Sequence, residues 1–503
     1  MTKTSHDVCI IGAGAAGSVI ASHLAKKGLN VAMLDAGPHR DPQKDFASDE
    51  LEMEKLFWDE PRISKGNDPI DLYRSTSGKG VGGSAVHYTA QLLRFHPKDF
   101  TNADWPISYK DVNPFYEDMT KQLHLAGPSS FPWKEFGDRF PFPAHHDLSN
   151  NTLKFREGLE KMGMKHAVSP LAILSAPYDE RHPCINRGFC EEGCMPDSKT
   201  TPLNTFIPES LQAGTTLIPE ATAVKIETGD DRKAKSVHYI LDDQQHEIEA
   251  SIVVVAAYAV ETPRLLLQSK NNDFPEGLAN SSGLVGRYLM TNMNDHLIAK
   301  FPEEIRMYRG NPVQALTMDF YQKGFILNSY GMRPVRLASL FFENDASCVG
   351  ENLRRRMLDY NHFTGFAMLG EVQPQKENRV ELSGQRDRFE QPVPRVTFSH
   401  HEKDLSIRKQ AKEMMERVAR AAGGEPLYHL EAHAHLMGGC RMGNDPATSV
   451  VNSYGQTHDI ENLFVAGAPT FVTAPAANPT LTVYSLAQRS AEYIESYFKS
   501  IRS

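Results

Sequence analysis

A glycine-rich turn near the N-terminus constrains the fold of this chain more than any other feature. Residues 7–17 begin as an apolar strand, pass through the turn and continue into an amphipathic helix. Gly12 permits the tight turn, Gly14 lets the backbone approach a pyrophosphate, and Gly17 lets the helix pack on the strand. Phosphates favour the free N–H groups at the start of such a helix, near Ala15. The pattern predicts a dinucleotide-binding β-α-β unit.

An acidic residue at the end of the next predicted strand supports the same interpretation. Residues 31–35 read Val-Ala-Met-Leu-Asp. Asp35 is placed to accept hydrogen bonds from ribose hydroxyls, which favours a cofactor without a 2′-phosphate.

Composition bounds the class of protein. A chain of 503 residues is too long to fold around one simple hydrophobic core, so we expect two domains or one domain with large insertions. The net charge of −9 and the lack of a basic run argue against a nucleic-acid partner. The longest apolar stretch, residues 252–260, is too short to span a bilayer, and the N-terminus contains no charged leader with a separate apolar region. We therefore expect no transmembrane segment and no secretory signal.

Elements typical of a nucleotide-binding fold recur at the start, middle and end of the chain. Residues 252–257 form a continuous apolar run, as in a buried parallel strand, and a helix start follows at 261–268. Residues 463–468 predict another short strand, and residues 479–498 predict a helix with one apolar face. Between them, residues 296–301 and 378–382 predict strands of an antiparallel sheet. We therefore expect a discontinuous nucleotide-binding domain with an inserted substrate domain.

A second glycine-rich loop occupies residues 78–84 and contains Gly80, Gly82, Gly83 and Ser84. So many small residues together predict backbone passing very near a ligand. The alternative is a surface turn, although the loop continues into apolar residues.

Together these motifs resemble the glucose–methanol–choline (GMC) oxidoreductases, flavoproteins that oxidise alcohols with FAD. The resemblance covers nearly the whole chain and includes residues 261–267 and the segment from His435 to Pro479. Residues 81–88 and 94–100 are most similar to the bacterial FAD-dependent glucose, gluconate and fructose dehydrogenase catalytic subunits. This implies an α/β fold, α+β overall, with a Rossmann-like FAD-binding domain and an inserted substrate domain on an antiparallel sheet. The implied boundaries are 1–100, 200–295 and 435–503 for FAD, 101–199 for a cap and cysteine segment, and 296–434 for substrate.

The resemblance also implies the active-site residues. His435 matches the catalytic histidine of the family, and Asn478 matches its second position, where we expect hydrogen bonding only because an amide does not exchange a proton at neutral pH. His433 is the competing base, and a buried core histidine with an asparagine helix cap is the plain structural alternative. The implied FAD contacts are Gly12, Gly14, Ala15, Gly17, Asp35, Gly80, Gly82, Gly83, Ser84, His87, Val224, Ala257, Gly467, Ala468, Pro479 and Thr480.

Two positions of the FAD region are special. A histidine at the position of His87 links covalently to the flavin in pyranose oxidases and usually does not in the dehydrogenase branch, so a covalent bond stays open here. Tyr258 follows the Ala256-Ala257 pair, where relatives commonly carry Gly or Asn. We expect this departure to alter packing near the flavin.

Three of the six cysteines, Cys184, Cys190 and Cys194, follow the pattern C-x5-C-x3-C. Thiolates bind iron–sulfur clusters or zinc, and structural zinc usually takes four ligands with C-x2-C pairs. The resemblance implies a 3Fe–4S cluster, although Met195 stands where relatives often have Pro. Buried thiols, a disulfide, or zinc with His182 as a fourth ligand are the alternatives.

A cluster would require an external electron acceptor, such as a cytochrome c subunit or a quinone. The resemblance adds a small companion subunit that carries the export signal, so the chain is either cytoplasmic or exported and membrane-associated through a partner. The predicted substrate is a sugar or polyol of the glucose, gluconate or glycoside type. An oxygen-using sugar oxidase with structural cysteines, and a flavin-binding lyase or scaffold without net oxidation, are the competing functions.

Overall fold

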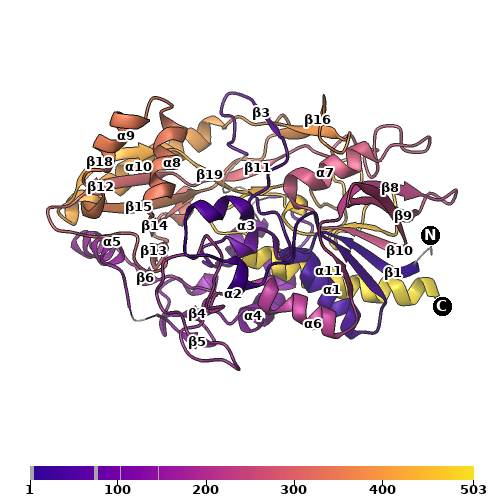
Figure 1. Cartoon of the computed structure of the whole chain (residues 1–503), viewed down its shortest axis with the longest axis horizontal. Coiled ribbons are helices and arrows are strands. Elements are labelled where there is room, and N and C mark those ends of the chain that lie inside the picture. The colour runs from indigo at the N-terminus through magenta and orange to yellow at the C-terminus, as the bar shows by residue number, and fades with distance from the viewer. Residues whose placement is uncertain (1–4, 73–76, 102, 146, 503) are drawn as a thin grey trace.

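The computed structural model describes residues 5–72, 77–101, 103–145 and 147–502. Two large β-sheets lie toward opposite ends of the long axis, and the two chain termini lie together at the end formed by the first sheet (Figure 1). None of the described helices combines the length and the apolar character needed to cross a bilayer.

The first sheet surrounds the N-terminal strand, whose residues 8–11 are all buried between neighbouring strands. Its parallel core runs β7-β2-β1-β10, with β20 beside the end of β10, and antiparallel β9 and β8 complete it. The run predicted from residue 252 is the buried end of a longer strand, because its polar first half pairs with β9 as a hairpin. The strands are β1 (Ser5–Ile11), β2 (Val31–Leu34), β7 (Thr216–Ile218), β8 (Thr222–Thr228), β9 (Ala234–Leu241), β10 (Gln244–Val255) and β20 (Leu463–Val465).

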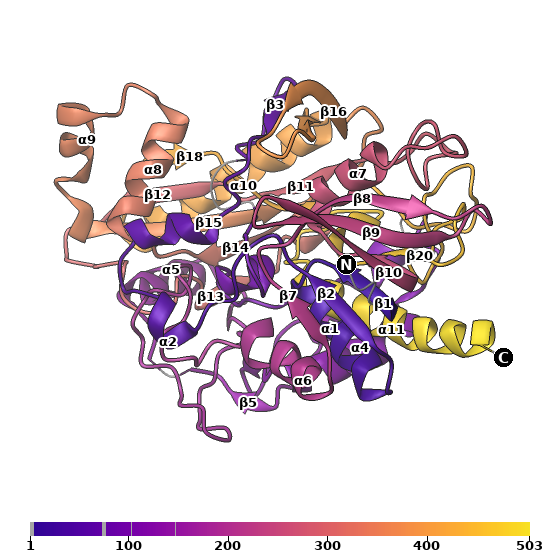
Figure 2. The ribbon, with the colours of Figure 1, turned by 45° about the vertical axis from the view of Figure 1, so that its right-hand side comes forward.

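Helices cover both faces of this sheet. The helices α1 and α11 pack against each other on one face with α4 and α6 beside them, and α7 lies on the other side near β8 (Figure 2). The helix predicted at 261–268 begins three residues earlier than expected, at Tyr258. The bounds are α1 (Ala15–Lys26), α4 (Tyr109–Gln122), α6 (Phe206–Gln212), α7 (Tyr258–Gln268) and α11 (Thr480–Arg502).

The second sheet is the larger of the two, and helices pack on its surface. Its main path is β18-β12-β15-β14-β13-β6, and β11 joins β15 to β19. The helices α5 (Asn150–Lys161) and α10 (Glu402–Ala421) pack on it, and α8 (Pro334–Asn344) and α9 (Gly350–Met357) follow each other at the far end. The strands are β6 (Ala167–Val168), β11 (Met290–Met293), β12 (His296–Lys300), β13 (Ala315–Thr317), β14 (Phe325–Ser329), β15 (Phe363–Gly370), β18 (Glu425–Leu430) and β19 (His433–Met437).

One predicted strand belongs elsewhere. We expected residues 378–382 in the same antiparallel sheet as residues 296–301, but β16 (Arg379–Arg386) forms a separate sheet with β17 (Pro392–Thr397) and β3 (Ile63–Lys65). The expectation was wrong because β16 pairs with the next strand, β17, which on its other edge pairs with β3 from a distant part of the chain. The remaining short elements are α2 (Pro42–Asp45), α3 (Pro97–Thr101), β4 (Ala126–Gly127) and β5 (Phe142–Pro143). The domain boundaries given above stay a prediction.

Candidate active site

A cavity of about 360 Å³ lies between the two large sheets. The end of β1, the start of α1, the strand β19 and the start of α11 all contribute to its wall. His435 and Asn478 line this cavity, and so does every predicted FAD contact except Gly17 and Gly82. The fold thus brings residues from the first, middle and last parts of the chain to one site.

The two predicted glycine loops touch each other beside this cavity. Gly82 N donates a 2.9 Å hydrogen bond to Ala13 O, and a Cβ on Gly83 would lie 3.0 Å from Gly14 Cα. Because both loops are bare backbone here, they leave a cradle that side chains would fill. A Cβ on Gly17 would lie 1.9 Å from Gly12 O. Gly17 therefore acts through the close packing of α1 on the turn, outside the cavity wall.

Asp35 is held in place by the same turn. Its Oδ2 accepts from Ala13 N at 2.9 Å and its Oδ1 accepts from Gly37 N at 3.0 Å. Burial raises the pKa of this carboxyl group, while the two backbone hydrogen bonds and then Arg40 oppose the rise. The carboxyl group therefore has a defined orientation at the end of β2, beside the cradle.

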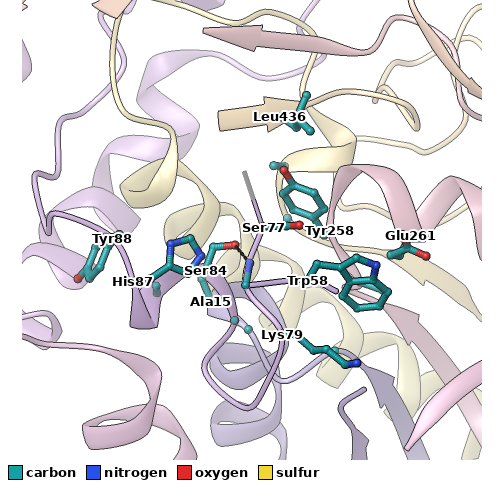
Figure 3. Close-up of a pocket in the computed structure, with 18 of the residues that line it drawn as sticks. Ala15, Trp58, Ser77, Lys79, Ser84, His87, Tyr88, Tyr258, Glu261 and Leu436 are labelled. Carbon is teal, nitrogen blue, oxygen red and sulfur yellow. Dashed lines mark hydrogen bonds between the residues drawn. The ribbon is translucent and has the colours of Figure 1, made fainter. Parts of the chain in front are cut away.

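His87 and the wall opposite it face each other across the cavity. Figure 3 shows His87 and Ser84 on one side, and Trp58, Tyr258 and Glu261 on the other. Burial first, and then the charge of Lys199, lowers the pKa of His87 to about 3, so the imidazole is neutral. Its Nε2 is buried and bonds to no described group. This free nitrogen is aimed at a site that a ligand can occupy.

The opposite wall contains charged residues that our sequence reasoning did not assign. Arg62 donates to Glu261 at 3.1 Å and to Ser77 at 2.6 Å, and its guanidinium lies 4.9 Å from the ring centre of Trp58. Glu261 also accepts from Arg264 at 2.9 Å, three residues along α7. In the sequence, only the i,i+3 spacing of Glu261 and Arg264 indicated an ion pair, and no pattern pointed to Arg62.

Strand β14 and neighbouring loops supply a polar wall. Tyr330 donates its hydroxyl to Glu191 at 2.7 Å, and Gln91 donates to Asn328 at 2.9 Å; all four residues line the cavity. They come from separate loops and strands, so no motif could have grouped them. The wall offers both donors and acceptors to a bound molecule with several hydroxyl groups.

The hydrogen bonds around His435 determine which of its nitrogens carries a proton. Asn292 donates its Nδ2 to Gly370 O at 3.1 Å and to Pro475 O at 2.8 Å, so its Oδ1 must be an acceptor. His435 Nδ1 lies 3.1 Å from that Oδ1 and is therefore the protonated nitrogen. Nε2 keeps its lone pair, and it has no hydrogen-bond partner among the described residues. Burial lowers the pKa of His435 to about 4, so the ring is neutral.

His433 is engaged differently, although it also lines the cavity. Arg408, which has no acceptor, donates to His400 Nε2 at 3.2 Å, so that nitrogen carries a lone pair. His433 Nε2 lies 3.1 Å from the same atom and must donate to it. Burial, followed by His400 and Arg408, lowers the pKa of His433 to about 3. The competing base therefore has its Nε2 committed to a neighbour, whereas His435 has not.

Asn478 lies just before the start of α11. Residues 478–480 and Val483 line the cavity, and Val483 N donates to Pro479 O at 2.9 Å in the first turn. Asn478 Oδ1 is buried without a partner in the part of the chain that the structure describes. The helix start thus directs an unsatisfied amide and its positive dipole end toward the cavity.

The three clustered cysteines line a second, smaller cavity. Their sulfurs accept N–H groups: Cys184 Sγ from Asn186 N at 3.4 Å, Cys194 Sγ from Lys199 N at 3.3 Å, and Cys190 Sγ from Asn311 Nδ2 at 3.4 Å. All three thiols are free, so the disulfide alternative is not realised in this structure.

The spacing of these thiols bears on the metal that they fit. No three His, Cys, Asp or Glu side chains in the described ranges converge closely enough to hold one metal ion. A zinc site needs such convergence, whereas in an iron–sulfur cluster each thiolate binds a different iron and the sulfurs stand farther apart. The three free thiols line one cavity, and N–H groups are directed at their sulfurs.

Comparison with known proteins decides the family. Residues 7–297 and 374–487 match the GMC oxidoreductase family. This chain is a GMC oxidoreductase. It is 31% identical to 2-methyl-1,2-propanediol dehydrogenase of Mycolicibacterium austroafricanum, over 98% of this chain and 96% of that protein. It is 30% identical to the fructose dehydrogenase large subunit of Gluconobacter japonicus, over 97% of this chain and 98% of the relative.

The fold comparison agrees with the sequence comparison. A variant of formate oxidase from Aspergillus oryzae RIB40 superposes with a TM-score of 0.75 at 15% identity, covering 99% of each chain. The predicted family and the predicted α/β fold class are confirmed. This GMC oxidoreductase is an FAD-dependent enzyme that acts on CH–OH groups of alcohols and sugars.

Proposed function

We propose that this GMC oxidoreductase is the catalytic subunit of a dehydrogenase that oxidises one hydroxyl group of a sugar or other polyol. The reaction converts CH–OH to C=O and releases two electrons and two protons. The arrangement of His435 carries the proposal, because it presents a neutral imidazole with a free Nε2 in the cavity that the predicted FAD contacts also line.

The residues of the large cavity fit FAD. The glycine cradle and the start of α1 would hold the pyrophosphate, Asp35 the ribose, and Val224, Ala257 and His87 would border the ring systems. Gly467, Ala468, Pro479 and Thr480 would close the opposite side. When bound, FAD supplies the acceptor for the hydride that leaves the carbinol carbon.

The side chains would then divide the remaining work. His435 Nε2 would accept the hydroxyl proton, because Nδ1 is already protonated and bonded to Asn292. The Asn478 amide would hold the substrate oxygen by hydrogen bonding, and the start of α11 would stabilise negative charge in the cavity. His87 would contact the flavin, and the intact mass of the denatured protein distinguishes a covalent bond from non-covalent binding.

The relatives narrow the substrate class. The names of two relatives specify a 1,2-propanediol and fructose, both of which carry hydroxyl groups on neighbouring carbons. The polar wall of Gln91, Glu191, Asn328 and Tyr330 could bind such a second hydroxyl. We therefore propose a substrate with neighbouring hydroxyl groups.

The cysteine cavity supports a route for the electrons. We propose that Cys184, Cys190 and Cys194 hold a 3Fe–4S cluster and that an external cytochrome c or quinone receives the electrons. The relative named as a large subunit supports a small companion subunit, through which the chain would be exported or associated with a membrane.

Replacing the base tests the active site. His435→Ala should lower kcat by on the order of 10²-fold with FAD still bound, because no general base remains. In the unmodified enzyme, kcat/KM should fall as the pH drops through about 4, since the imidazole becomes protonated there. Turnover of sugars and polyols with a dye acceptor measures kcat and the pH dependence of kcat/KM, and flavin absorbance measures bound FAD. His433→Ala is the matched control and should have a smaller effect, and unchanged turnover in His435→Ala would refute the assignment.

Replacing one cysteine tests the electron route. Cys190→Ser should lose iron and stop reduction of a cytochrome, while anaerobic reduction of the flavin by substrate continues. Iron and sulfide analysis of anaerobically purified protein provides the direct measurement. Cys348→Ser, a buried cysteine outside both cavities, should keep its iron. An unmodified enzyme that contains no iron and produces peroxide rapidly would instead be an oxygen-using oxidase.

A further inference from the structure

A buried lysine stands between the two cavities. The Lys199 side chain is almost fully buried, and its Nζ donates to Val86 O at 2.7 Å, to Tyr88 O at 3.1 Å and to Cys190 O. An ammonium group has three N–H donors, and three carbonyl groups accept them here. Each donor is satisfied, which stabilises the charged form against burial, an effect that lowers the pKa of Lys199.

The charge of this lysine has no carboxylate partner. No Asp or Glu in the described residues forms an ion pair with Lys199, although most other buried or half-buried cations here have one. An uncompensated cation inside a protein is costly. Among groups that can become anionic, the thiols of Cys190 and Cys194 act most strongly on this charge, followed by the carboxyl group of Glu191. The backbone N of Lys199 also donates to Cys194 Sγ at 3.3 Å.

A single chain segment, residues 87–89, lies between the large cavity and the cysteine loop, and Lys199 holds it in place. His87, Tyr88 and Thr89 line the large cavity, while their carbonyl side is tied to the cysteine loop. Asn311 makes a second tie, because its Nδ2 donates to Thr89 O at 3.1 Å and to Cys190 Sγ at 3.4 Å. The same segment therefore borders the predicted flavin site on one side and the cysteines on the other.

We infer that Lys199 is a positioning residue that holds the His87–Thr89 segment against Cys190 and supplies the positive charge that balances an iron–sulfur cluster on Cys184, Cys190 and Cys194. This inference rests on the proposed function. A fixed cation beside a cluster stabilises its more negative, reduced state and so raises its reduction potential, and hydrogen bonds to the sulfurs act in the same direction.

The test measures the potential of the cluster, a property that a merely structural lysine would not set. Lys199→Met keeps the length of the side chain and removes its charge. In the full chain, purified anaerobically with any companion subunit, we expect iron content to be retained and the midpoint potential from an EPR-monitored redox titration to become more negative. Lys199→Arg, which keeps the charge, should restore the potential at least in part.

A matched control separates charge from the loss of any lysine. Lys98 also donates to a backbone carbonyl, that of Tyr321 at 3.1 Å, but lies outside both cavities. Lys98→Met should leave the potential unchanged. If Lys199→Met loses its iron, Lys199→Gln, which keeps two N–H donors without the charge, decides the question by the same titration.

The outcomes distinguish this inference from the function on which it rests. An unmodified enzyme without iron and sulfide overturns the proposed electron route, and the role of Lys199 with it. An enzyme that contains iron but has the same midpoint potential in the unmodified chain and in the uncharged Lys199 variant overturns the role of Lys199 alone.

Discussion

The position of the proton on the His435 imidazole depends on a single amide from another strand. Asn292 lies on β11 and His435 on β19, and the two strands pair in the second sheet. The amide is itself oriented by two buried carbonyl groups, which leaves only its oxygen for the histidine. Residues that fix a tautomer in this way matter nearly as much as the base itself.

Asn292→Leu should therefore lower kcat by roughly 10- to 100-fold, because His435 is no longer held with Nε2 free. Bound FAD, measured by its absorbance, should be unchanged. Asn344→Leu is the matched control, since Asn344 also donates to two carbonyl groups but lies away from the cavity. Equal kcat values for Asn292→Leu and the unmodified enzyme would show that the tautomer is set by other means.

Tyr258 explains a departure noted in the sequence. Its φ angle is +70°, in the left-handed region that glycine and asparagine adopt most readily. This conformation gives a physical reason for the Gly or Asn that the family resemblance leads us to expect at this position. A non-glycine residue in this region costs on the order of 1 kcal/mol, and Tyr258 lines the cavity near Arg62, whose guanidinium lies 5.7 Å from the ring centre. Strain is thus located at the site wall.

At the scale of elements, the first and last helices depend on each other. His23 of α1 lies 2.9 Å from Glu495 of α11, and Lys499 bonds the same carboxylate at 2.6 Å. These partners lower the pKa of Glu495 to about 2. The hydrogen bond from Lys499 lowers it most, followed by the hydrogen bond from His23 and the charge of Lys27.

Glu495→Gln should lower stability in a way that depends on pH. Because the pKa of Glu495 in the folded protein lies below its ordinary value of 4.5, its contribution is complete above about pH 4.5 and is lost as the pH falls toward 2. The difference in urea midpoint between Glu495→Gln and the unmodified protein should be largest at neutral pH and shrink through this range. A difference that stays constant with pH would mean that the pairing contributes nothing through its charge.

At the scale of the whole molecule, the cavity joins the two large sheets. The first sheet and its helix starts supply the cradle, and the second sheet with the loops beside it supplies His435 and the polar wall. A ligand in this position contacts both parts at once. It should therefore stabilise the folded chain as a unit.

Adding FAD to protein stripped of it should raise the thermal midpoint in proportion to the logarithm of FAD concentration. Linkage gives about 2.7 kcal/mol of stabilisation when free ligand exceeds its Kd one hundredfold. Differential scanning calorimetry over a range of FAD concentrations measures the shift, and AMP alone, which reaches only the cradle, should produce a smaller one. A midpoint independent of FAD would refute binding at this cavity.

Local sequence determined the nucleotide-binding half of this protein. The strand at residues 8–11, the glycine turn, Asp35 and the final helix could all be predicted, because backbone freedom, alternation and apolar faces act over a few residues. His435, Asn478 and the three cysteines were also found from sequence, but through family resemblance rather than local physics.

Only the tertiary structure decided which groups form hydrogen bonds or ion pairs around these residues. Asn292, Arg62, Lys199 and the polar wall carry no motif, since each acts through a partner far along the chain: Arg62 is paired with Glu261, and Lys199 with Val86. The separate sheet of β16, β17 and β3 escaped prediction for the same reason. Hydrogen bonds and charges are short-ranged in space, so which groups they join is decided when distant segments meet.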